Sequence, residues 1–260
     1  MMLYRSLIYR ELKLTNKRFL IMLVLFLLTA LLLVIPLLLG SMVDPAAADE
    51  ETSDVVLLLT LTLAATGGVL AGTNNGILKA DIASGWKRYA KVLPAKPLQS
   101  AAADVLVKLL WIGMFGLLSV GFAAFCLHLT GCNTIRHTVN SYLLITAATL
   151  LIDVVYTAIV SLAKTGKDLT KFILLATGGT FALFAILSRA GGFAFGGWMD
   201  NMQQTVDNGE MLTPEQQEQL MQMIRFLGSG TMTLIAAGSL AVVCAAFFLV
   251  LWKAYERREA

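Results

Sequence analysis

Long apolar stretches separated by short polar segments organise this chain. Six stretches are each long enough to cross a hydrocarbon core about 30 Å thick. They cover residues 19–39, 55–78, 105–127, 139–163, 172–188 and 230–252. Because few charges interrupt them, the pattern predicts an all-α integral membrane protein with six transmembrane helices, forming a single transmembrane domain over residues 1–260.

The composition supports a membrane protein. Hydrophobic residues make up 57% of the chain, charged residues only 14%, and the mean hydropathy is +0.75. A soluble domain could not bury that much apolar surface. The first apolar run is too long for a cleavable signal and lacks a small-residue cleavage site, so it is expected to stay as a helix. Cys126, Cys132 and Cys244 show no disulfide or metal spacing.

Residues 3–18 predict an amphipathic helix before the first apolar stretch. One half of its helical wheel is mainly apolar, although Glu11 and Thr15 intrude there, and the other half carries the cations. This pattern suits an N-terminal interfacial helix lying in the membrane plane. A direct cytosolic extension of the first transmembrane helix is the alternative.

The distribution of cations predicts the orientation. With the N-terminus in the cytosol, seventeen of the twenty Lys and Arg residues lie at cytosolic segments or helix ends, and only Arg136, Arg189 and Arg225 lie outside. Ten of the seventeen acids then lie outside. Cytosolic segments of membrane proteins carry an excess of Lys and Arg. We therefore expect a multi-pass plasma-membrane protein with both termini cytosolic.

The long outer segment over residues 190–229 contains a helix start. Thr213 is placed as a cap, Pro214 occupies the first helical position, and Gln216 suits a capping box. We expect an amphipathic outer helix before the last transmembrane helix. A lid packed on the bundle without a substrate role is the plainer interpretation of the same pattern.

Two glycine-containing triplets predict close packing between helices. Thr66-Gly67-Gly68 and Thr177-Gly178-Gly179 both lie inside apolar stretches. Small residues let transmembrane helices approach each other closely. A structural role is expected for both triplets.

Catalytic and nucleotide-binding motifs were not found in the sequence. It holds no G-x-x-x-x-G-K-[ST], no H-E-x-x-H and no G-x-S-x-G. The chain should not hold a nucleotide by a phosphate-binding loop. No catalytic residue, cofactor or metal site is predicted in this chain, and no nucleic-acid partner is expected. Whether the chain forms part of an enzyme is left open.

Asp153 is the one acid inside a predicted transmembrane helix. A carboxylate in lipid is costly and is a functional candidate by default. It could carry protons or pair with a cation across the bundle. An interhelical hydrogen bond, with the carboxyl protonated, is the structural alternative.

The polar segment over residues 80–99 is cytosolic in this orientation. Trp86, Tyr89 and Leu93 recur at three- and four-residue steps, with cations between them. This predicts one or two helical turns with an aromatic face and a basic face, ended by Pro94 and Pro97. An ordinary basic loop at the lipid headgroups is the alternative.

This segment resembles a motif of ABC-2 type permease subunits of Gram-positive bacteria, D-x-x-S-G-W-x-x-Y-x-x-x-L-P. Here it is formed by Asp81, Ser84, Gly85, Trp86, Tyr89, Leu93 and Pro94. The number of predicted transmembrane helices and the long last outer loop are also similar to that family. The resemblance implies that this segment is a coupling helix contacting a separate ATPase. The ATPase-coupling residues would be Asp81, Gly85, Trp86, Tyr89, Leu93 and Pro94.

The resemblance implies a function and partners. The chain would be the permease subunit of an ABC exporter, pairing with itself or with a paralogous permease in the lipid bilayer, while the partner ATPase binds ATP and Mg²⁺. The substrate expected is amphipathic or hydrophobic, such as a peptide. Two alternatives stay open: a proton-coupled secondary transporter using Asp153, and a non-transporting membrane scaffold or immunity protein.

Overall fold

The computed structural model describes residues 2–43, 50–73, 96–130, 135–162, 166–191 and 225–259, together with residues 214, 218 and 222. Six long helices and no strand are found in these residues. The helices are α1 (Met2–Val43), α2 (Glu50–Ala71), α5 (Pro97–Thr130), α6 (Ile135–Val160), α7 (Gly166–Gly191) and α10 (Gly230–Glu259). The predicted all-α class is therefore confirmed for the described part of the chain.

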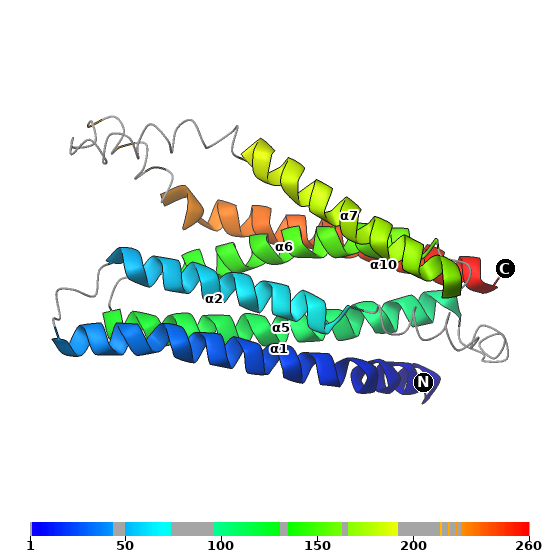
Figure 1. Cartoon of the computed structure of the whole chain (residues 1–260), viewed down its shortest axis with the longest axis horizontal. Helices are drawn as coiled ribbons and strands as arrows, with labels where there is room; N and C mark the ends of the chain where they lie inside the picture. Colours follow the sequence, from blue (N-terminus) through cyan, green and yellow to red (C-terminus); the bar gives the residue numbers. More distant parts are fainter. Residues whose placement is uncertain are drawn as a thin grey trace.

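The helices run lengthwise along one another in an elongated bundle (Figure 1). α2 packs against α1, α5 and α6, whereas α10 packs against α5 and α6. α7 packs mainly against α6 and lies along one side of the bundle (Figure 1). Both chain termini lie at the same end, which is referred to below as the terminal end.

Aromatic side chains and small residues build the core. The rings of Phe19 and Trp111 stack with centroids 4.2 Å apart, and Phe115 meets Phe19 edge-on at 5.8 Å. On α2, a Cβ added at Gly68 would lie only 3.1 Å from Ile112 Cα of α5. The small residues of α2 thus let its backbone approach α5 closely, as expected for membrane helices.

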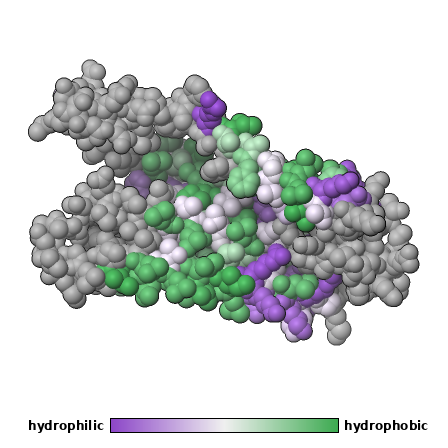
Figure 2. Space-filling view, viewed as in Figure 1, coloured by the Kyte–Doolittle hydropathy of each residue, from purple (hydrophilic) through white to green (hydrophobic). Residues whose placement is uncertain are grey.

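Within the described ranges, four helices are long and apolar enough to cross a membrane: Arg5–Leu32, Pro97–Phe125, Arg136–Val160 and Gly230–Arg257. Leu59–Ala71 of α2 is a shorter apolar helix. Figure 2 shows hydrophobic surface along the later part of α1 and hydrophilic surface toward its N-terminal part. These helices and the exposed apolar surface indicate a multi-pass membrane protein.

Two predicted helix boundaries differ from the structure. Residues 3–18 are helical, but they continue into the first apolar stretch without a break, which is the geometry of a direct extension. α2 ends at Ala71, whereas the apolar stretch was predicted to continue as helix to residue 78. The helix ends there in a tight turn, in which Thr73 N donates a hydrogen bond to Leu70 O (3.1 Å). The carbonyl oxygen of Thr73 accepts a hydrogen bond from Arg18.

Candidate functional site

A buried ion pair between α5 and α6 is the most distinctive polar feature of the described bundle. Lys108 of α5 is 1% exposed and Asp153 of α6 is 7% exposed. Lys108 Nζ donates to Asp153 Oδ2 and forms a salt bridge with it. Two opposite charges therefore compensate each other in a region where a lone charge would be strongly destabilising.

Thr73 joins this ion pair from the end of α2. Its Oγ1 lies 3.3 Å from Lys108 Nζ, which donates to it, and 3.2 Å from Asp153 Oδ1. The hydroxyl has one proton, which can go to Asp153 or to the carbonyl of Val69 at 2.9 Å. Three helices therefore meet in one polar cluster, which we define as Thr73, Lys108 and Asp153.

α1 and α10 close the polar cluster on its other sides. Arg18 of α1 donates from Nη1 to the carbonyl oxygen of Thr73 at 2.6 Å. The ring of Phe247 in α10 lies with its centroid 4.4 Å from Lys108 Nζ, within cation–π distance. Five helices thus contribute to the cluster or to its immediate surroundings.

A close backbone approach leaves little room beside Lys108. An added Cβ at Gly72 would lie 2.7 Å from both Lys108 Cα and Cγ. Because Cα belongs to the backbone, no rotation of the lysine side chain could relieve that contact. The glycine after α2 therefore allows α5 to place Lys108 between the helices.

Further polar contacts lie around the cluster. Trp111 Nε1 donates to Thr15 Oγ1 at 2.9 Å, so that one face of the N-terminal part of α1 is fixed on α5. Tyr255 of α10 donates to Asp104 Oδ2 of α5 at 2.6 Å. Glu11 and Thr15, which interrupt the apolar half of the predicted helix, are buried in the bundle. Buried polar groups with partners fix how helices pack.

The structure locates only part of the site predicted from the sequence. Asp153 lies in the cluster, and its cationic partner is Lys108, which sequence analysis did not single out. The predicted coupling residues lie outside the described residues, namely Asp81, Gly85, Trp86, Tyr89, Leu93 and Pro94. A signal for Lys108 was present in the sequence, because it is a lysine inside an apolar stretch while Asp153 is an acid inside another.

The chemistry available to the cluster is charge compensation, hydrogen bonding and proton exchange. Among the described residues, no group of three or more His, Cys, Asp or Glu side chains could hold a metal ion. Comparison with known proteins gives no assignment, since no protein-family model, no curated protein and no solved structure matches this chain.

Proposed function

We propose that this chain is the membrane permease subunit of an ABC exporter. A separate ATPase would supply the energy for exporting an amphipathic or hydrophobic substrate, such as a peptide. The motif from Asp81 to Pro94 and its resemblance to ABC-2 type permeases support this proposal. So does the lack of a phosphate-binding loop in the sequence, since such a transporter must obtain ATP hydrolysis from a partner.

The polar contacts of Thr73 are the observation that carries the mechanism. Thr73 follows the end of α2, and the chain continues from it toward the predicted coupling segment. Its carbonyl accepts from Arg18, and its hydroxyl contacts both charges of the ion pair. A displacement of the coupling segment would therefore act on α1, α5 and α6 through polar contacts, and on α2 through the backbone.

In this proposal, α2 and α7 complete a set of six transmembrane helices. α7 has 26 residues, which corresponds to about 39 Å at the usual helical rise. The terminal end of the bundle would face the cytosol of a bacterial cell, and residues 74–95 would connect α2 and α5 on that side. One six-helix chain also needs a second permease to enclose a path, so we propose a homodimer or a paralogous pair.

Purification of the complex from its native host tests this proposal. The tagged chain, at its native expression level and in mild detergent, is expected to retain an ABC ATPase subunit. The eluate should then hydrolyse ATP in a Mg²⁺-dependent manner, while the chain expressed alone should not. Recovery of the intact, membrane-inserted chain without any nucleotide-binding subunit would contradict the proposal.

Proton-coupled transport through Asp153 is the second candidate, because the structure places this carboxylate beside an amine within the bundle. Proton exchange within such a pair can be linked to conformational change. The two candidates differ in their energy source. Transport by the purified chain alone, driven by a pH gradient in proteoliposomes and abolished in Asp153→Asn, would favour this second function.

A further inference from the structure

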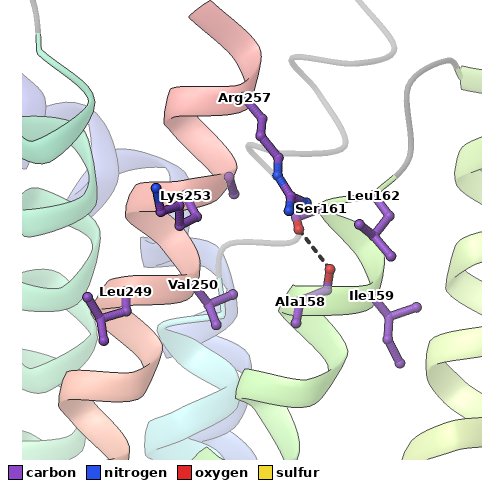
Figure 3. A pocket seen from close by; sticks show the side chains of 9 residues that line it. Ala158, Ile159, Ser161, Leu162, Leu249, Val250, Lys253 and Arg257 are labelled. Carbon is purple, nitrogen blue, oxygen red and sulfur yellow. Dashed lines mark hydrogen bonds between the residues drawn. The ribbon is translucent and has the colours of Figure 1, made fainter. Parts of the chain in front are cut away.

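A groove between the ends of α6 and α10 combines an apolar floor with cationic side chains. It has a volume of about 400 Å³ and is drawn from close by in Figure 3. The ends of α6 and α10 that line it lie at the terminal end of the bundle (Figure 1). α6 and the turn after it contribute Ala158, Ile159, Ser161 and Leu162, and α10 contributes Leu249, Val250, Lys253, Ala254 and Arg257. The α10 residues recur at four-residue steps and therefore share one face of that helix.

Polarity changes in one direction along this groove. Leu249 and Val250 lie on the inner part, with Lys253 one helical turn and Arg257 two turns farther toward the end of α10. Arg257 is therefore about 12 Å along the helix axis from Leu249. Figure 3 shows the Arg257 side chain reaching across the groove toward Ser161. An apolar inner part followed by a cationic outer part matches the order of acyl chain and headgroup in a phospholipid.

We propose that this groove binds the phosphate headgroup of an anionic phospholipid, with one acyl chain lying against Leu249, Val250 and Ile159. Arg257 is the principal anchor, since its guanidinium can donate two parallel hydrogen bonds to a phosphate. It makes no ion pair within the described part of the chain. Basic pockets between membrane helices are suited to anionic headgroups.

The other polar groups around the groove are expected to contribute less to headgroup binding than Arg257. Lys253 Nζ bonds Glu256 Oε2 at 2.8 Å, so part of its charge is already compensated. Ser161 Oγ donates its proton to the carbonyl of Ala158 at 2.7 Å and can offer a phosphate no hydrogen bond while it does so. Lys253 is therefore a secondary contact, and removal of the Glu256 charge should strengthen headgroup binding.

Native mass spectrometry of the full chain tests the lipid site. The detergent-solubilised protein is titrated with phosphatidylglycerol or phosphatidylcholine of the same acyl chains. The wild type is expected to retain phosphatidylglycerol preferentially. Arg257→Gln should reduce that preference about fivefold, the size expected for one cation beside an anionic headgroup. Glu256→Gln should increase it.

Matched controls separate this site from general attraction between charges. Arg136 is exposed near the start of α6, far along the helix from the groove, so Arg136→Gln should leave the preference unchanged. Val250→Trp fills the inner groove and should weaken retention while all charges remain. Equal retention of the two lipids by the wild type, or an unchanged preference in Arg257→Gln, would overturn the proposal. Equal competition by inorganic phosphate alone would instead assign the groove to a soluble anion.

Discussion

Lys108 and Asp153 are 45 positions apart in the sequence and form a buried ion pair between α5 and α6. Thr73 supplies a hydroxyl to both charges, and Arg18 holds the carbonyl of the same threonine. The pair therefore connects the helix that precedes the predicted coupling segment with the helices that surround it. Its charges compensate each other, so the effect of substituting one residue on stability should depend on whether the other residue is present.

The first prediction concerns the two charges of the pair. Lys108→Met and Asp153→Leu should each destabilise the protein by roughly 3–5 kcal/mol, because either leaves one buried charge without its partner. The double variant Lys108→Met/Asp153→Leu should lose less than the worse single variant. Denaturant unfolding in one detergent, arranged as a double-mutant cycle, measures the coupling. Purely additive losses would show that the two charges do not stabilise each other.

Gly72 carries the second prediction. Gly72→Ala would place a Cβ 2.7 Å from Lys108 Cα, so α2 and α5 would have to separate, at a cost of about 1–3 kcal/mol. Gly113 on α5 is the matched control, because an added Cβ there meets no atom within 4 Å in the described part of the chain. Gly113→Ala should be neutral or stabilising by up to about 1 kcal/mol. Thermal unfolding of the two variants should separate them, and equal midpoints would refute the proposed close approach.

The sequence predicted where helices form better than where they end. Residues 105–127 and 230–252 lie inside α5 and α10, because a long apolar run without proline has no stable alternative to a helix in lipid. The end of α2 was predicted too late. The chain after Ala71 reads Gly-Thr-Asn-Asn-Gly, a polar stretch typical of a helix end, and the turn there also contacts Arg18 and Lys108, which are distant in sequence.

Helix packing and the ion pair were less accessible to sequence analysis. Gly67 and Gly68 do pack closely, against Phe115 and Ile112. In the second triplet, an added Cβ at Gly178 would meet none of the described residues within 4 Å, and one at Gly179 would meet Ile159 at 3.5 Å. A local pattern does not state which face of a helix meets a neighbour. For the same reason, Asp153 and Lys108 each stand out as a charge inside an apolar stretch, but their pairing required the packing of α5 against α6.

Orientation gives the third prediction. We expect the terminal end to face the cytosol, since most Lys and Arg residues gather in the segments predicted on that side. In a background without native cysteines, Arg136→Cys at the opposite end should react in intact cells with a membrane-impermeant maleimide. Arg257→Cys should react only after permeabilisation. The reverse pattern would invert the topology and remove the cytosolic coupling segment from the proposed function.

The last prediction concerns the coupling segment. Trp86, Tyr89 and Leu93 recur on one side of the predicted helical turns. Large aromatic side chains at the centre of a contact dominate interface energies, and their truncation costs roughly 2 kcal/mol or more. Trp86→Ala/Tyr89→Ala should therefore leave the protein inserted and dimeric but unable to retain its ATPase or support transport.

Lys87→Ala is the matched control for this double variant. It removes a cation from the same segment but leaves the aromatic face, so retention of the ATPase should change only mildly, as is usual for a charge at the rim of an interface. Pull-down of the ATPase beside each variant, at equal membrane level, makes the comparison. Normal ATPase retention and normal transport by a well-expressed Trp86→Ala/Tyr89→Ala variant would contradict this prediction and would favour a basic loop at the lipid headgroups.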